Sequence, residues 1–159
     1  MQHHDIILKV SKIKPEQSET FCLDDLIDEL YIFVKQELQK SGKTNVGVEV
    51  CKYSNIKKCW VSTDRTRLRQ IFRNLLDNAV QLTDRGYIFF GYHTSVNNNI
   101  NFFVDDTGVG IYSDTNLGLS IAEGLVQQMG GKMEVKPAED AGTSVHFNII
   151  CTPVEFFEN

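Results

Sequence analysis

The stretch from Asp64 to Thr83 constrains the fold more than any other, because its apolar residues recur at helical spacing. Asp64 stands where an N-cap residue belongs, and Gly86 follows the end of the stretch. The sequence therefore predicts an amphipathic helix with one face in a core. The predicted apolar face consists of Leu68, Ile71, Phe72, Leu75, Leu76, Ala79 and Val80.

Two asparagines stand beside this apolar face. Asn74 and Asn78 are four residues apart, so their amides project from the same side of the helix. A side-chain amide at the edge of a core needs a hydrogen-bond partner. Taken alone, the pair is explained by contacts with the backbone of a loop. A role in binding a ligand needs support from elsewhere in the chain.

Composition and charge exclude several classes of protein. A chain of 159 residues is most simply one domain. The net charge of -5 argues against nucleic acid or an anionic membrane surface as a partner, and no apolar run approaches the roughly 20 residues that span a bilayer. The cysteines have no C-x-x-C spacing and the histidines no metal-ligand or triad spacing, so we expect reduced cytosolic thiols and no such metal site. The cysteines are Cys22, Cys51, Cys59 and Cys151.

The order of the predicted elements indicates an α+β fold. Residues 6–13 have the pattern of the end of a helix, which Pro15 stops. Helices are also expected at 23–42, ending near Gly42, and at 117–129, ending at Gly130 and Gly131. This order predicts helices layered on one face of a mixed sheet. The expected strands are 46–50, 58–61, 87–96, 100–106, 132–135 and 143–150, with turns at 97–99 and 137–142.

Three further features are placed where a nucleotide would need them. Asp106 ends a predicted strand and is followed by Gly108 and Gly110, which would let the backbone approach a flat ligand. Its carboxylate could accept a hydrogen bond from the exocyclic amine of adenine, but would repel the carbonyl oxygen of guanine. Gly118, at the start of a helix, would expose N–H groups suited to phosphate, and Thr143 could help to hold a base. Each feature alone is also explained by a turn or a helix start.

In this order the motifs resemble the catalytic and ATP-binding domain of bacterial sensor histidine kinases, within the GHKL superfamily that includes gyrase and MutL. The resemblance covers residues 21–150. NLLDNA (74–79) is similar to the N box, DTGVG (106–110) and NLGLSIAEGLVQQMGG (116–131) to the glycine boxes, and GTSVHFNI (142–149) to the closing strand. The segment around residues 63–76 is most similar to hybrid kinases of the Bacteroidetes type. The resemblance implies a two-layer sandwich, with a mixed β-sheet covered on one face by three helices.

The resemblance also implies roles for individual residues. Asn78 would supply its amide oxygen to Mg²⁺, and Asn74 would face the ATP phosphates or the water shell of the metal. Hydrolytic members of the superfamily have a glutamate in place of Asn74, and an amide cannot accept the proton of a water molecule. The chain is therefore expected to be unsuited to ATP hydrolysis. Asp106 and Thr143 would hold adenine, Gly108 and Gly110 would allow close approach, and Gly118 with Leu119 would open the helix toward the phosphates.

Two positions depart from the family pattern. Gln81 stands where the family usually has a lysine, in a K-[FY]-[TS] motif that ends here in Thr83. The family's long ATP lid is expected between Ile111 and Asn116, where only four residues stand. Natural loss, deletion, and a segment left out of the chain all remain open as explanations for the short lid.

The resemblance implies a domain organisation and partners. Residues 1–18 would be the end of an upstream phosphotransfer helix and its linker, and residues 19–159 the ATP-binding catalytic domain. The domain would phosphorylate a histidine on an upstream dimerisation domain, from which a response-regulator receiver domain is charged. It would be cytoplasmic, with membrane attachment only through other parts of a parent sensor. The alternatives are a degenerate domain that signals by protein contact and, less favoured, a serine kinase of the anti-sigma-factor type.

Overall fold

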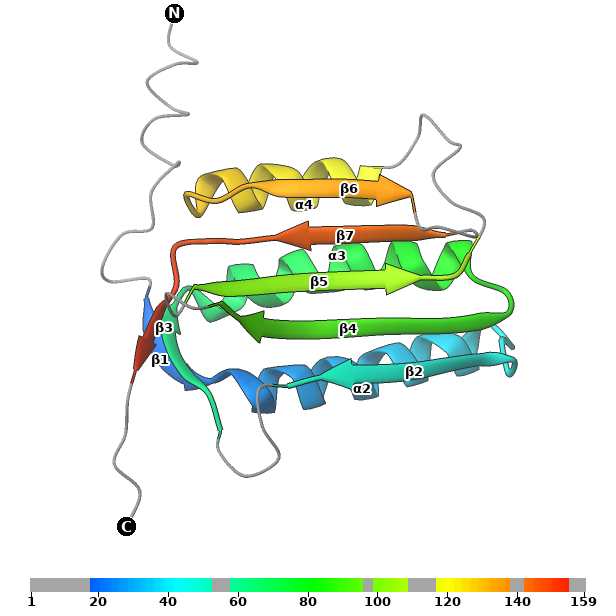
Figure 1. Ribbon diagram of the computed structural model, residues 1–159. Coiled ribbons are helices and arrows are strands. Elements are labelled where there is room, and N and C mark those ends of the chain that lie inside the picture. Colours follow the sequence, from blue (N-terminus) through cyan, green and yellow to red (C-terminus); the bar gives the residue numbers. More distant parts are fainter. Residues whose placement is uncertain (1–17, 53–57, 96–98, 109–116, 138–141, 155–159) are drawn as a thin grey trace, which may run out of the picture.

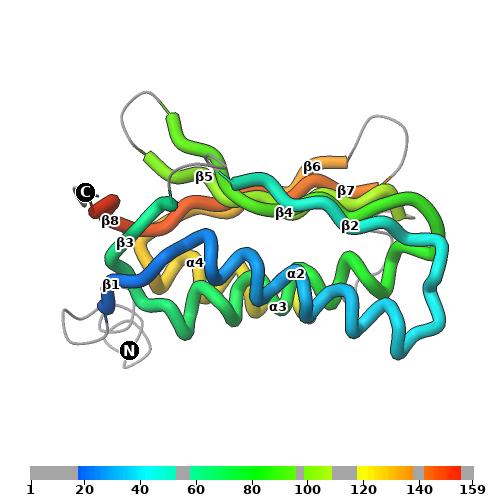
Figure 2. The backbone as a smooth tube through the Cα atoms, turned by 90° about the horizontal axis from the view of Figure 1, so that it is seen from below, coloured from blue at the N-terminus to red at the C-terminus, as the bar shows by residue number. Residues whose placement is uncertain are grey.

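A computed structural model describes residues 18–52, 58–95, 99–108, 117–137 and 142–154. Three helices pack on one face of a five-stranded sheet, and a smaller three-stranded sheet lies at one end of this sandwich (Figures 1 and 2). The helices are α2 (Leu23–Lys40), α3 (Arg65–Leu82) and α4 (Leu117–Gln128). The predicted α+β sandwich of a mixed sheet with three helices on one face is confirmed. No helix in the described ranges has the length and apolarity needed to cross a bilayer.

The large sheet has the strand order β2-β4-β5-β7-β6. The β2–β4 pair is parallel and the other pairs are antiparallel, so the sheet is mixed. β5 lies in the middle, and its last residue, Asp106, is paired with Ile88 on one side and Thr143 on the other. The strands are β2 (Val46–Cys51), β4 (Gly86–Thr94), β5 (Ile100–Asp106), β6 (Met133–Pro137) and β7 (Thr143–Phe147).

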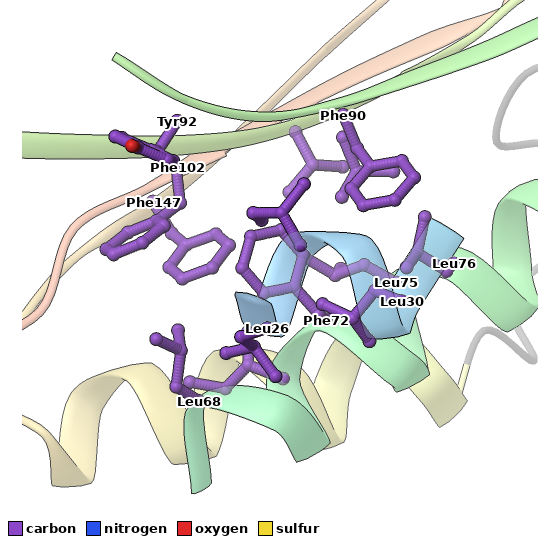
Figure 3. Packing of buried hydrophobic residues seen from close by; sticks show 14 of the residues in the cluster. Leu26, Leu30, Leu68, Phe72, Leu75, Leu76, Phe90, Tyr92, Phe102 and Phe147 are labelled. Carbon is purple, nitrogen blue, oxygen red and sulfur yellow. The ribbon is translucent and has the colours of Figure 1, made fainter. Parts of the chain in front are cut away.

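Helix α3 forms as the apolar spacing predicts. The Asp64 carboxylate caps its N-terminus by accepting a hydrogen bond from the backbone N–H of Arg67 at 3.1 Å. All seven residues of the predicted apolar face are buried. The ring of Phe72 lies 5.4 Å from that of Phe147 and 5.8 Å from that of Phe102, measured between centroids. These rings join α3 to the middle of the sheet (Figure 3).

Helices α2 and α4 end in the same way, with a glycine in the left-handed region. Gly42 has a φ of 68° and Gly130 a φ of 75°. After α2, the N–H of Gly42 bonds to Gln39 O at 3.1 Å and that of Lys43 to Leu38 O at 2.9 Å. This pair of bonds is a Schellman motif. The predicted helix ends near Gly42 and at Gly130–Gly131 are thereby confirmed.

The second sheet was not expected from the sequence. Its order is β1-β3-β8, with β1 at Glu19–Cys22, β3 at Trp60–Thr63 and β8 at Thr152–Val154. The strand expected at 58–61 begins at Trp60 instead, and it belongs to this sheet rather than to the large one. Its partners are distant in sequence and too short to show a period-two pattern. The helix end expected at 6–13 and the hairpin turn at 97–99 lie wholly or largely outside the described residues.

Candidate functional site

Asp106 lies at the C-terminal end of the central strand β5 and is only 5% exposed. Its Oδ1 atom accepts a hydrogen bond from the backbone N–H of Gly108 at 2.9 Å. Burial raises the pKa of the Asp106 carboxyl above its ordinary value, while bonds from the N–H groups of Gly108 and Thr143 act in the opposite direction. The site therefore holds a desolvated carboxylate that is partly compensated by backbone donors.

Two buried threonines neighbour this strand end, Thr143 beside Asp106 and Thr83 beside Gly108. Thr83 is 0% exposed and Thr143 is 2% exposed, and neither Oγ1 atom has a hydrogen-bond partner among the described residues. Thr143 is the direct cross-strand neighbour of Asp106. Thr83 follows the last residue of α3 and was not among the predicted site residues. The sequence did offer one indication of Thr83: it occupies the last position of the K-[FY]-[TS] motif, directly after the helix.

Gly108 lies between these groups and the end of α3. A Cβ atom added to Gly108 would lie 2.2 Å from the carbonyl oxygen of Leu82 and 2.9 Å from Thr83 Oγ1. No side chain fits in that space, so the glycine is required by close approach. We call Thr83, Asp106, Gly108 and Thr143 the threonine–aspartate cluster.

The two asparagines lie along α3, as the helical spacing predicts, and both residues are partly exposed. Asn74 Oδ1 accepts a hydrogen bond from Gln70 Nε2 at 2.9 Å. Its Nδ2 atom is buried and has no partner among the described residues. No hydrogen bond joins the Asn78 amide to another described residue. We call Asn74 and Asn78 the amide pair.

The first turn of α4 lies against α3 beside this amide pair. A Cβ atom on Gly118 would lie 3.3 Å from the backbone oxygen of Asn74, so the glycine lets the two helices approach closely. The side chain of Leu119 packs against the core, which leaves only its backbone to contribute to a site. Gly110 and the expected lid at 111–116 lie outside the described residues.

The cluster and the amide pair are joined by one helix. Asn74, Asn78 and Leu82 occupy successive turns of α3, so about 12 Å separates the first from the third at 1.5 Å per residue. Figure 1 shows that the C-terminal ends of α3 and β5 and the start of α4 lie at the same end of the molecule. The arrangement offers a buried carboxylate with hydroxyls at one end and neutral amides at the other.

The last turn of α3 has a cation beside it that was not predicted from the sequence. Gln81 is exposed, and no basic residue lies in the last turn of α3. The ammonium of Lys43 contacts this turn instead, at 2.5 Å from Val80 O and 3.2 Å from Gln81 O. The described residues contain no group of three or more His, Cys, Asp or Glu side chains that could hold a metal ion. Any metal here would therefore depend on amide oxygens and on oxygens of the ligand.

Comparison with known sequences identifies a family. Residues 63–153 match the family of histidine kinase-, DNA gyrase B- and HSP90-like ATPases. Histidine protein kinase 1 of Candida albicans is 28% identical in an alignment 181 positions long, which covers 96% of this chain and 7% of that protein. The aerobic respiration control sensor protein ArcB of Escherichia coli K12 is 30% identical in an alignment 112 positions long, which covers 56% of this chain and 14% of ArcB. The chain thus spans only a small part of the length of these relatives.

Solved structures show the same fold. The catalytic domain of histidine kinase ThkA, in a nucleotide-free form, superposes with a TM-score of 0.68 at 27% identity, covering 83% of this chain and 95% of that chain. Full-length ShkA in complex with AMPPNP superposes with a TM-score of 0.72 at 22% identity, covering 86% of this chain and 32% of the ShkA chain. The motifs, the sandwich and the family match agree with one another. The chain belongs to the family of histidine kinase-, DNA gyrase B- and HSP90-like ATPases.

Proposed function

We propose that this chain binds ATP with Mg²⁺ and donates the γ-phosphate to a histidine on an adjoining dimerisation domain. One observation carries the proposal. In the described part of the chain, three buried side-chain polar atoms lack a hydrogen-bond partner, on Asn74, Thr83 and Thr143. Two of them belong to the threonine–aspartate cluster and the third to the amide pair. Buried polar groups without partners are uncommon in folded proteins, and a bound nucleotide would supply the missing partners.

The threonine–aspartate cluster fits the adenine end of ATP. The Asp106 carboxylate would accept a hydrogen bond from the exocyclic amine, and it would repel the oxygen that guanine carries at the same position. The hydroxyls of Thr83 and Thr143 can each donate to a ring nitrogen or accept from the amine. Gly108 packs against the end of α3, and its backbone N–H holds the Asp106 carboxylate in place for the base.

The amide pair fits the phosphate end of ATP. Asn78 would hold Mg²⁺ through its amide oxygen, and the bound metal would supply positive charge that stabilises the phosphates. The buried Nδ2 of Asn74 is a hydrogen-bond donor, so it can orient a phosphate oxygen or a water of the metal shell. Neither amide can accept a proton at neutral pH. The pair therefore positions ATP for phosphoryl transfer and does not activate water for hydrolysis.

The remaining roles follow from the family and from the names of the relatives. Gly110 would extend the close approach begun at Gly108, and the backbone N–H groups of Gly118 and Leu119 would face the phosphates. The phosphorylated histidine would belong to a dimerisation and phosphotransfer domain, with residues 1–18 as the end of its last helix. From there a receiver domain would be charged on an aspartate. We place this domain in the cytoplasmic part of a larger membrane sensor.

The test of this proposal is nucleotide binding with matched variants. Titration with ATP and Mg²⁺ should give saturable binding that is stronger than binding of GTP. Asp106→Ala should weaken ATP binding by about tenfold to a hundredfold, since a hydrogen bond to a charged group contributes about 1.5–3 kcal/mol. Asp106→Asn should reduce the preference for ATP over GTP, because an amide N–H can donate to the guanine oxygen. Asn78→Ala should weaken the dependence of binding on Mg²⁺.

Asp105→Asn is the matched control for the Asp106 variants. Asp105 is the preceding residue of β5 and faces the opposite side of the sheet, where its carboxylate accepts a hydrogen bond from Ser144 Oγ at 2.6 Å. This variant should bind ATP as the parent chain does. Equal ATP binding by the parent and by Asp106→Ala would contradict the proposed site.

A second function, a degenerate domain that signals by protein contact, is favoured by Gln81. Its exposed amide replaces a cation that the family usually has near the phosphates. Joining the chain to an upstream histidine domain and assaying for acid-labile phosphate separates the two functions. Transfer would exclude the degenerate alternative, and ATP binding without transfer would favour it.

A further inference from the structure

We propose that Lys43 is a positioning residue for the threonine–aspartate cluster, which it fixes by clamping the last turn of α3. The inference rests on the proposed function, because it concerns how tightly the same site binds adenine nucleotides. Lys43 belongs to the loop between α2 and β2, so it reaches the site from a different part of the chain.

The Lys43 ammonium is held by two helix carbonyls and one carboxylate. Its Nζ donates to the carbonyl oxygen of Val80 at 2.5 Å and to that of Gln81 at 3.2 Å. It also forms an ion pair with the Asp84 carboxylate at 3.2 Å. An ammonium group has three N–H donors; two of them bind these helix carbonyls, and its charge is paired with Asp84. The Lys43 side chain is only 18% exposed, whereas that of Asp84 is 81% exposed.

The clamp satisfies groups that the helix cannot satisfy itself. The last four carbonyl groups of an α-helix have no partner within the helix, and the C-terminus carries partial negative charge. Helix α3 has no basic residue of its own in its last turn. Lys43 supplies a positive charge at this helix end through its contacts with Val80 and Gln81. The Lys43 backbone is itself held by the 2.9 Å bond from its N–H to Leu38 O, in the Schellman motif that ends α2.

The clamped turn leads directly into the threonine–aspartate cluster. Leu82 and Thr83 follow the two carbonyls that Lys43 binds, and both contact the space beside Gly108. The next turn is anchored by the same loop, since the N–H of Gly86 donates to Asn45 O at 3.2 Å. The loop between α2 and β2 therefore holds both sides of Thr83. Movement of this turn would move the Thr83 hydroxyl and the Leu82 carbonyl relative to Asp106.

A positioning role for Lys43 can be distinguished from direct electrostatic attraction between Lys43 and the phosphates of ATP. A free cation near the phosphates would attract ATP more than ADP, and ADP more than adenosine. The Lys43 ammonium is instead hydrogen-bonded to two carbonyls of α3, and its charge is paired with Asp84. Loss of the Lys43 ammonium should therefore weaken the binding of adenosine, ADP and ATP by the same factor, because all three ligands share the adenine base.

The experiment compares Lys43→Met with Lys43→Arg and with Lys40→Met in the same chain. Lys40, in the last turn of α2, has a 73% exposed side chain and one ion pair at 4.0 Å, so it is the matched control. Lys43→Met should raise the dissociation constants of adenosine, ADP and ATP alike, by about threefold to tenfold. This is the change expected for the loss of one well-placed hydrogen bond. Lys43→Arg should restore most of the affinity, and Lys40→Met should bind as the parent chain does.

A second readout needs no nucleotide. In Lys43→Met, the amide protons of Thr83 and Gly86 should exchange faster with solvent, while those of β5 stay protected. If the parent chain binds no adenine nucleotide, the proposed function fails, and the exchange rates still test the clamp. Unchanged exchange at Thr83 and Gly86 overturns the inference. So does a loss of affinity that grows with the number of phosphates, or a lowered melting temperature with unchanged dissociation constants.

Discussion

The substitution Gly108→Ala tests whether the site is built by close approach of the β5 loop to the end of α3. The added Cβ would lie 2.2 Å from the carbonyl oxygen of Leu82 and 2.6 Å from its carbonyl carbon. An ordinary carbon–oxygen contact needs a little over 3 Å, so one segment must move by about 1 Å. Both neighbouring groups are backbone, so rotation of a side chain cannot relieve the overlap.

Two effects of this movement can be measured separately. Overpacking of this kind costs about 1–3 kcal/mol of unfolding free energy, which urea denaturation followed by circular dichroism would detect. Displacement of binding groups by about 1 Å can cost up to about a hundredfold in function, so ATP affinity should fall by roughly tenfold or more. The affinity is measured by calorimetry at a temperature where the variant is fully folded.

Gly124→Ala is the control, because it makes the same chemical change in a space that is open. Gly124 lies inside α4, and nothing lies within 4 Å of a Cβ added there. Alanine in a helix interior is favoured over glycine by about 0.5–1 kcal/mol, so this variant should be slightly more stable and bind ATP normally. If Gly108→Ala keeps both the stability and the ATP affinity of the parent chain, the reasoning from close approach is wrong.

Three further predictions concern the core and the ionisable groups. Phe72→Ala should lower the free energy of unfolding by about 3–5 kcal/mol in urea titration, since the ring is fully buried among three aromatic rings. Burial raises the pKa of Asp106 in the folded chain, so its ionised form costs stability at neutral pH, and this cost disappears as the pH falls below the ordinary carboxyl pKa. Asp106→Asn without nucleotide should therefore melt higher than the parent chain at pH 7 and equally at about pH 3; a lower melting temperature at pH 7 would contradict this. Burial raises the pKa of the Cys59 thiol to about 11 and that of Cys151 to about 12, so iodoacetamide at about pH 8 should leave both unmodified by mass spectrometry until urea is added.

The helices and the large sheet could be predicted because their signals are local. The apolar face of α3, its Asp64 cap and the glycine ends of α2 and α4 all lie within the segments that they define. The second sheet could not be predicted in the same way. β1, β3 and β8 have three or four residues each, and their pairing depends on contacts between segments far apart in the chain.

Neighbours within the candidate site could be predicted where local chain geometry alone brings residues together. Helical spacing put Asn74 beside Asn78, and strand pairing placed Asp106 beside Thr143. Thr83 and Lys43 were not among the predicted residues. Thr83 reaches the cluster only through the approach of Gly108 to α3, and Lys43 reaches α3 from a loop 37 residues earlier than Val80. Neither contact leaves a periodic signal in the sequence.

The site also concentrates energetic costs that the fold alone does not require. Leaving a buried polar group without a partner costs about 1–3 kcal/mol, and the three such atoms on described residues lie on Asn74, Thr83 and Thr143. Asp106, beside two of them, adds a desolvated carboxylate. Together these costs are comparable with much of the 5–15 kcal/mol that stabilises a typical domain. A chain selected only for stability would lose them through simple substitutions such as Thr83→Val. A ligand that binds these groups would offset the costs, and its binding should raise the melting temperature of the folded chain as its concentration increases.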